Sequence, residues 1–493
     1  MSSPAESPAV PIQWTNKVYF KFYEPVVLLE ALNTAARETA VSTTTNESNR
    51  TNDPVDLYHA FVYKLAHVCD NAPGGETVTS VMILRTGSTG FCYYFGSNQR
   101  SEQQLDDTKE YVGSLLQLVR DSPSRSSEPS LEHDPVLRLV LLFNQERLTG
   151  YLSRLELYAR ECLANPSALN LDEKEVITSS IQDFVESSRL EAPLPTTDTE
   201  FTDRCEELLR FISTFSQSPA GAMIQAQARQ GRMLGYKSQE CWSEFQHNLS
   251  RILAYADSVS ILRKAQKKWP MLFYNLEIQA IPSSQPISRS IRQKSQKASE
   301  IVGRMTRKQP IIDKFREYAE SLQNFDLDAR IKQEWSKDSF RPIVHAEVLL
   351  LDWLERNGGT VDHRFFNDWK YIGSSKPTCK LCHYYFESHG SMIPHRPSHG
   401  NLYISWRVPD IYTTQGEHVA AARQVIVDKV LDKIRKDAFD LVEQRVPPSY
   451  KDHDSNTFSA RVTLQDLLTI DDRSTHGMDN VARLMQGMTL GNA

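Results

Sequence analysis

The sequence predicts an α/β layered domain in the C-terminal half of the chain, preceded by a mainly helical α+β region. Three observations support this prediction. After residue 310, helical patterns alternate with short apolar segments, the order typical of layered α/β domains. Between residues 135 and 268, apolar side chains recur at helical spacing. Before residue 130, one pair of short apolar segments interrupts the helical pattern.

The N-terminal third combines helices with one hairpin. Apolar residues on one face predict a helix over Asp56–Asp70. Thr77–Thr86 and Phe91–Gly96 flank a Gly-Ser-Thr-Gly linker, which predicts a β-hairpin. A further helix is expected over 101–120. In the following region, stripes such as Ile177, Ile181 and Phe184 predict helices that pack in a core.

In the C-terminal half, predicted helices alternate with predicted strands. Helices are expected at 311–323, His345–Arg356, Lys380–His389 and Val419–Val446, and strands within Met271–Ile281 and at Trp369–Gly373 and Leu402–Val408. The helix from His345 is apolar almost all round, so it should be buried. Pro447 and Pro448 end the long helix that precedes them.

Composition shifts suggest the boundaries of four regions. We expect a mixed α/β region at 1–130, a mainly helical region at 131–268, an α/β domain at 270–446 and a loosely ordered tail at 447–493. The segment 288–308 is rich in Lys and Arg and is a candidate for contacts with nucleic-acid phosphates. The alternative is a solvated linker, which is the commoner role of such stretches.

The bulk properties exclude several classes of protein. Hydrophobic residues make up 40% of the 493, enough for a sizeable core, and the net charge of −6 gives no global basic field for nucleic acid. The chain has seven cysteines, an odd number, and five of them are isolated in the sequence. This argues against a disulfide framework and indicates a reducing compartment. Because no secretory signal or membrane-length apolar run is visible, we expect an intracellular protein, cytoplasmic or nuclear, with no membrane partner.

Two short motifs carry the chemistry. Cys379 and Cys382 form a C-x-x-C pair, which can clamp zinc or, after a strand, act as a redox pair. His345-Ala-Glu347 begins the buried helix 34 positions earlier. Three ligands, His345, Cys379 and Cys382, would leave zinc one open position, and Glu347 could then act as an acid–base group. The H-E-x-x-H pattern of zinc proteases fails, because Ala346 replaces its glutamate.

These motifs resemble the cytidine deaminase-like superfamily, whose signature is H-x-E followed by P-C-x-x-C. The similarity is closer to the fungal branch of nucleic acid/nucleotide deaminase-like proteins. It rests on Tyr371-Ile-Gly-Ser-Ser-Lys-Pro-Thr-Cys379-Lys-Leu-Cys382, then His399-Gly400, Trp406 and Pro409, and it covers roughly residues 340–410. One departure is Pro377, which is separated from Cys379 by Thr378 where the signature places proline next to the cysteine.

The resemblance implies a fold, a cofactor and a reaction. The fold would be the α-β-α layered, cytidine deaminase-like one. His345, Cys379 and Cys382 would bind zinc, zinc-bound hydroxide would be the nucleophile, and Glu347 would shuttle protons. The enzyme would be a hydrolase acting on C–N bonds of cyclic amidines, with a nucleobase, nucleoside or nucleic acid as substrate. His399 and Trp406 are candidates for the pocket wall, and a turn histidine and a core tryptophan are the alternatives of at least equal weight.

Two non-catalytic alternatives remain open. Cys379, Cys382, His395 and His399 have the spacing of a C2H2 zinc finger with structural zinc. However, Pro394 and Pro397 disfavour the helix that a finger requires, and a finger leaves His345 and Glu347 without a role. The second alternative is an inactive deaminase fold used for binding, which the intact Glu347 disfavours.

Overall fold

A computed structural model of the chain describes residues 11–37, 53–87, 90–122, 133–165, 171–190, 197–233, 241–287 and 297–444. The predicted tail at 447–493 lies outside these residues, and so does part of the basic segment, 288–296. Among the helices that are described, none combines the length and apolarity that crossing a membrane requires.

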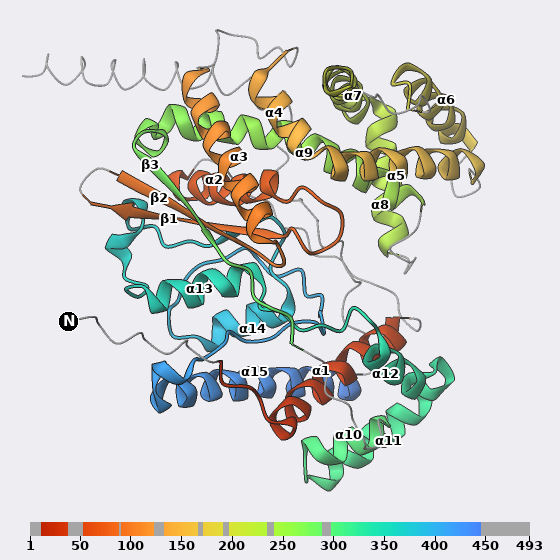
Figure 1. Ribbon diagram of the computed structural model, residues 1–493. Helices are drawn as coiled ribbons and strands as arrows, with labels where there is room; N and C mark the ends of the chain where they lie inside the picture. The colour runs from red at the N-terminus through yellow and green to blue at the C-terminus, as the bar shows by residue number, and fades with distance from the viewer. Residues whose placement is uncertain are drawn as a thin grey trace, which may run out of the picture.

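Helices dominate the architecture (Figure 1). In the first part of the chain they are α1 (Asn16–Arg37), α2 (Pro54–Cys69), α3 (Glu102–Asp121), α4 (Pro135–Phe143), α5 (Gln145–Ala164), α6 (Leu171–Ser187), α7 (Asp198–Gln217), α8 (Pro219–Met233) and α9 (Cys241–Lys268). They continue with α10 (Ala298–Met305), α11 (Gln309–Leu322), α12 (Leu327–Ser336), α13 (Ala346–Arg356), α14 (Lys380–Ser388) and α15 (Glu417–Gln444). The strands are β1 (Thr79–Thr86), β2 (Gly90–Ser97), β3 (Leu276–Ile281) and β4 (Gly373–Ser374).

The four strands form one mixed sheet in the order β3-β2-β1-β4. β1 and β2 are the predicted hairpin, antiparallel from Thr79↔Ser97 to Thr86↔Gly90. β3 adds to β2 in parallel, and β4 adds to β1 antiparallel with Ser80 opposite Ser374. The sheet therefore joins strands from both halves of the chain. The predicted domain boundaries near 130, 268 and 446 stay a prediction.

Helices cover both faces of the sheet and form two cores. α2 and α3 lie on one face and α13 and α14 on the other (Figure 1). The first core joins α2 to the helices from α3 to α9. The second joins the N-terminal helix α1 to α10–α15. Gly373 marks a close approach of α2 to the sheet, because a Cβ there would lie 2.8 Å from the backbone nitrogen of Tyr63.

A buried ion pair fastens the loop after α2. Asp70 and Arg147 are both almost fully buried and form a salt bridge. Asp70 also accepts hydrogen bonds from Thr77 Oγ1 at 2.8 Å and from Ser375 Oγ at 3.0 Å. Burial by itself would raise the pKa of Asp70, but the charge of Arg147 and these hydrogen bonds lower it. The loop at 70–77 is thus tied to the segment that leads into the cysteine pair.

Most predicted elements are confirmed and one is wrong. The hairpin and the helices α2, α3, α11, α13, α14 and α15 lie where the sequence predicts them, and the strand expected within 271–281 is β3. At 369–373 only the last residue enters a strand, β4. The strand expected at Leu402–Val408 is wrong, since the segment makes one isolated bridge, Ile343↔Trp406. Its partner segment turns into α13 at Ala346, so the ladder cannot lengthen.

Candidate metal centre

The first component of the site is the N-terminus of α13. His345 is the N-cap residue in an extended conformation (φ −70°, ψ 152°), and Glu347 lies in the first turn. Most of the side chains of this helix, chiefly leucines and a valine, are buried, as the sequence predicts. The buried side chains fix the helix against β1 and β2, and its first turn carries His345 and Glu347 to the edge of a cavity.

The second component is the N-terminus of α14. Cys379 is its N-cap residue, and Cys379 Sγ accepts a hydrogen bond from the backbone N–H of Cys382 at 3.4 Å. A thiolate is stabilised at this position by the helix dipole and by the free amides of the first turn. Both cysteines are buried, with exposed fractions of 4% and 0%.

The fold brings the predicted histidine and cysteines together. Nδ1 of His345 lies 3.5 Å from Sγ of Cys379 and 3.5 Å from Sγ of Cys382. The three potential ligand atoms all lie within 4.8 Å of one another. One nitrogen and two sulfurs are donors that zinc prefers, and such a set leaves a fourth position for another ligand. The donor chemistry therefore fits a zinc ion.

The protonation of the three groups is linked. Burial would raise the pKa of Cys379, but a hydrogen bond with Cys382 and the charge of His345 lower it well below its usual value. The pKa of Cys382 is raised by burial and by the hydrogen bond with Cys379. Burial would lower the pKa of His345, whereas the neighbouring Cys379 thiolate raises it. One thiolate beside an imidazolium is thus favoured in the absence of a cation.

Glu347 is a buried carboxyl beside the ligand group. It is 5% exposed. Burial raises its pKa, and the negative charge of Cys379 raises it further. A raised pKa makes the carboxyl a better proton acceptor, which suits a general acid–base group.

A cavity of about 1140 Å³ opens from the site. His345, Glu347 and Cys379 lie in its wall. Other parts of the wall come from the loop at 73–78, from α5 and α9, and from residues 399–405. The helical region at 145–247 thus borders the same cavity as the candidate metal ligands.

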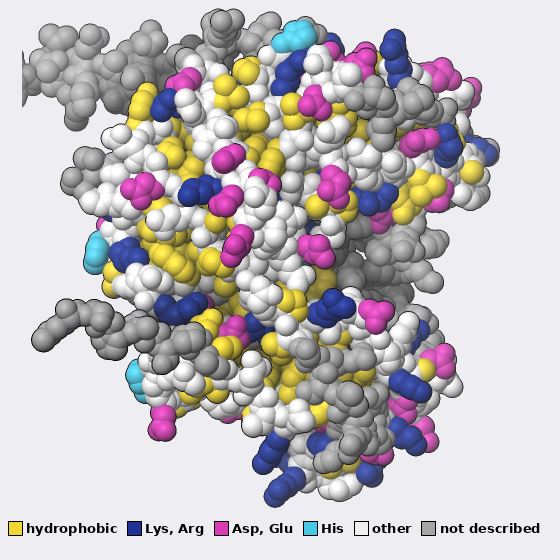
Figure 2. Space-filling model, viewed as in Figure 1, with side chains coloured by type: hydrophobic (Ala, Val, Ile, Leu, Met, Phe, Trp, Pro, Cys, Tyr) yellow, Lys and Arg dark blue, Asp and Glu magenta, His cyan; other side chains and the backbone are white. Residues whose placement is uncertain are grey.

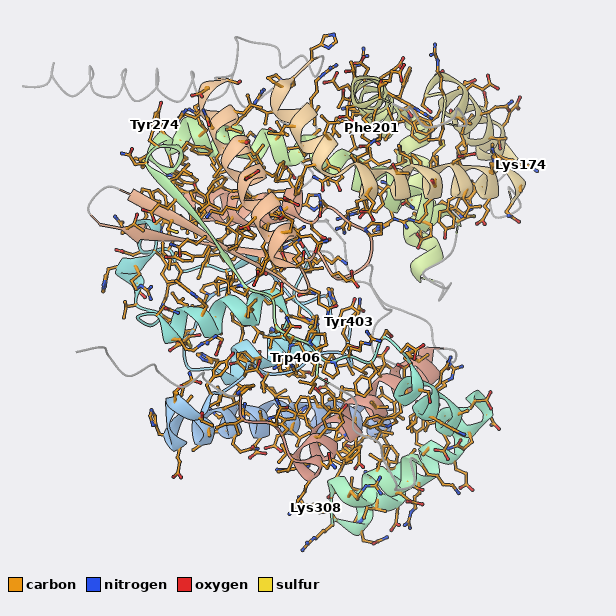
Figure 3. The ribbon with its side chains drawn as sticks, viewed as in Figure 1. Lys174, Phe201, Tyr274, Lys308, Tyr403 and Trp406 are labelled. Atoms are coloured by element: carbon orange, nitrogen blue, oxygen red, sulfur yellow. The ribbon has the colours of Figure 1, made fainter. Side chains whose placement is uncertain are left out.

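The two residues considered for the pocket wall have different positions. His399 lines the cavity, and its Nδ1 accepts the backbone N–H of Asn401 at 3.0 Å. Trp406 is fully buried and is absent from the described wall, which agrees with the alternative of a core tryptophan. Its Nε1–H instead donates to Cys382 Sγ at 3.1 Å. The Trp406 ring contacts Phe22 of α1 and Tyr385 of α14, whereas Tyr403 lines the cavity; both Trp406 and Tyr403 are labelled in Figure 3.

Sequence reasoning missed one residue of the site, Asn98. It directly follows β2, lines the cavity, and accepts the backbone N–H of Ala346 at 2.8 Å through Oδ1. An asparagine after a predicted strand is most often a turn residue. Its contact with α13 follows from the sheet and is not visible in any local pattern.

The structure contradicts the zinc-finger alternative. Within the described part of the chain, neither His395 nor His399 joins the cysteines in a group of possible metal ligands. His395 Nε2 instead lies 3.3 Å from His383 Nδ1, and its ring stacks on Phe386. Helix α14 ends at Ser388, before Pro394 and Pro397, so the helix that a finger requires does not continue to these histidines.

A second group of possible ligands consists of His133, Asp203 and Glu206. These three side chains already surround a protein cation, the guanidinium of an arginine. The guanidinium of Arg138 contacts all three, at 2.7 Å from His133 Nδ1 and 2.8 Å from Glu206 Oε2. This cluster links α4 to α7 and has the character of an ion-pair network. It gives no reason to place a metal ion there.

Comparison with protein families supports the resemblance. Residues 344–410 match the family model of the OTT_1508-like deaminases, which belong to the cytidine deaminase-like superfamily. The matched segment contains His345, Glu347, Cys379 and Cys382. Comparison with curated proteins and with solved structures gives no significant match.

Proposed function

We propose, from the deaminase-family domain at residues 344–410, that the protein is a zinc-dependent hydrolytic deaminase of nucleobases, as such or within a nucleoside or nucleic acid. The observation that carries the proposal is the grouping of His345, Cys379 and Cys382 within 4.8 Å at a cavity that Glu347 also lines. We further propose that the sheet and its covering helices are the α-β-α layers of this superfamily, with the hairpin β1–β2 as the first strands.

The proposed roles follow from the positions of the side chains. His345, Cys379 and Cys382 would hold zinc. Zinc in such a site supplies Lewis acidity, which makes water a nucleophile near neutral pH. Glu347 would carry one proton of the attacking water to the ring nitrogen and then the second proton of that water to the leaving amine. Water thus replaces the amino group of the base, and ammonia leaves.

The surface charges bear on the form of the substrate. On the face shown in Figure 2, described Lys and Arg side chains are interspersed with Asp and Glu. Residues of both charges also line the cavity, for example Arg154, Arg341, Glu76 and Asp338. This favours recognition of the base and its immediate surroundings over attraction by a general basic field. Contact of 288–308 with nucleic acid stays a prediction.

The test is an assay of ammonia release from a panel of bases, nucleosides, nucleotides and oligonucleotides. Zinc-loaded wild-type protein should deaminate at least one of them. Glu347→Gln should keep its zinc and lose roughly 100- to 10,000-fold in rate. Glu334→Gln is the matched control, because Glu334 lines the same cavity but pairs with Lys337 at 2.5 Å; this variant should remain active.

Two results would contradict the proposal. One is the absence of ammonia release from every substrate although the protein holds zinc, which would favour a binding protein with a deaminase fold. The other is a Glu347→Gln variant as active as the wild type, which would remove Glu347 from the proton transfer.

A further inference from the structure

Helix α13 begins without a cap from its own N-cap residue. His345 occupies that position, and its side chain makes no capping hydrogen bond. Its imidazole is directed to Cys379 and Cys382 instead. At the start of α3, by contrast, the cap is local, because Ser101 accepts the N–H of Gln104. An imidazole whose Nδ1 is directed to the candidate metal position cannot use that atom to accept a free amide of its helix.

Asn98 supplies the missing acceptor from another part of the chain. Its Oδ1 accepts the N–H of Ala346 at 2.8 Å, across 248 positions of sequence. Its Nδ2 donates to the carbonyl oxygen of Gly75 at 2.8 Å, and its backbone N–H donates to Val78 at 3.0 Å. These two further bonds fix the amide, so that Oδ1 faces α13. Asn98 is only 7% exposed.

We propose that Asn98 is a positioning residue of the metal centre. By holding the first turn of α13 it fixes Nδ1 of His345 relative to the sulfurs, which belong to a different helix, α14. It fixes Glu347 in the same way, because Glu347 is the second residue of α13. The inference rests on the proposed function for the roles of His345 and Glu347. It gives the hairpin of the N-terminal half a part in building the site.

A purely structural role is the competing explanation, and Asn144 provides the comparison. Asn144 is also buried, and its Nδ2 donates to the carbonyl oxygens of Val68 and Val140, each at 2.9 Å. It joins α2 to α4 in the first core and is absent from the cavity wall. Loss of either side-chain amide should lower the stability of the fold. Only loss of Asn98 should change the metal centre.

The experiment uses the full chain, freed of metal and reloaded with zinc or with cobalt(II) as a spectroscopic probe. We compare the wild type with Asn98→Ala, Asn98→Asp and Asn144→Ala. Zinc affinity is measured by competition with a chelator, and the cobalt form by its thiolate charge-transfer and ligand-field bands.

We expect Asn98→Ala to bind zinc about 10- to 100-fold more weakly and to shift the cobalt bands. Asn98→Asp should restore part of both, because its carboxylate accepts the N–H of Ala346 at a helix N-terminus although it cannot donate to Gly75. Asn144→Ala should match the wild type in both measurements. If Asn98→Ala does not fold, Asn98→Gln replaces it, since its longer side chain should displace the amide and shift the cobalt bands.

The inference is overturned if Asn98→Ala, or Asn98→Gln in its place, binds zinc and cobalt as Asn144→Ala does. It is also overturned if Asn98→Asp is no better than Asn98→Ala. These outcomes are separate from the test of deamination. A zinc-bound wild type that releases no ammonia contradicts the proposed reaction alone, whereas unchanged metal binding in the Asn98 variants contradicts the positioning role alone.

Discussion

The hydrogen bond from Trp406 to Cys382 leads to a sharp prediction. The indole Nε1 lies 3.1 Å from Cys382 Sγ, and the side chain is fully buried. Phe22 of α1 stacks on the ring with a centroid distance of 5.9 Å, and Tyr23 Oη donates to the carbonyl oxygen of Trp406 at 3.0 Å. Trp406→Phe should therefore keep an aromatic ring in this place and remove the donor.

The size of the effect follows from the type of bond. A hydrogen bond to a charged acceptor contributes about 1.5–3 kcal/mol. The indole donor stabilises the thiolate, the form that a metal ion requires. Since about 1.4 kcal/mol corresponds to a tenfold change in a binding constant, we expect zinc affinity to fall by roughly 10- to 100-fold. The smaller ring also leaves a void, which costs on the order of 1 kcal/mol of stability.

The assay must separate these two effects. Zinc affinity is measured by chelator competition and stability by urea unfolding of the zinc-loaded protein. Trp335→Phe is the matched control: Trp335 is 4% exposed and belongs to the same core, where it packs on Phe340 at 5.3 Å. Both variants should lose stability, but only Trp406→Phe should lose zinc affinity. Equal zinc affinities in the two variants would refute the role of the N–H···S bond.

Three further predictions concern the ligands, a buried ion pair and one carboxyl. In elemental analysis, His345→Ala should lose zinc, whereas His395→Ala should keep about one zinc ion per chain. The reverse result would support the zinc-finger alternative. Asp70→Asn leaves the charge of Arg147 buried without its salt bridge and should lower the free energy of unfolding in urea by about 3–5 kcal/mol; a loss below about 1 kcal/mol, as for an exposed pair, would contradict this. Burial raises the pKa of Asp352 from 3.8 to about 6, although Arg356 lowers it. Folding therefore takes up a proton at Asp352 when the pH lies between these two pKa values. The free energy of unfolding of the wild type relative to Asp352→Asn, measured by urea titration, should rise as pH falls from about 6 towards 4. If this difference between the two proteins does not change with pH, the pKa of Asp352 is not raised.

The motifs of the candidate site could be found in the sequence because each is local. His345 and Glu347 lie two positions apart at a helix start, and Cys379 and Cys382 three apart at another. Residue type and offset are enough to indicate their chemistry. The burial of α13 could be predicted from its apolar residues alone.

The surroundings of the ligands could not be predicted, because they depend on tertiary structure. The contact of Asn98 with α13 requires that β2 and α13 be neighbours in space. Trp406 looked equally suited to a pocket wall or a core, and only its contact with Cys382 decides between them. The alternating apolar pattern at 402–408 failed to form a strand because its partner segment is too short.

The sheet order has a consequence for synthesis of the chain on the ribosome. β1 is central in the sheet, but its neighbour β4 is translated last of the four strands, and Ser375 meets Asp70 across 305 positions. At about 5–20 residues per second, translation of that interval takes about 15–60 s. During this time one edge of the hairpin has no partner strand, and the set of helices that buries α1 is incomplete. Nascent chains of this protein should therefore need protection by chaperones until the cysteine pair has left the exit tunnel.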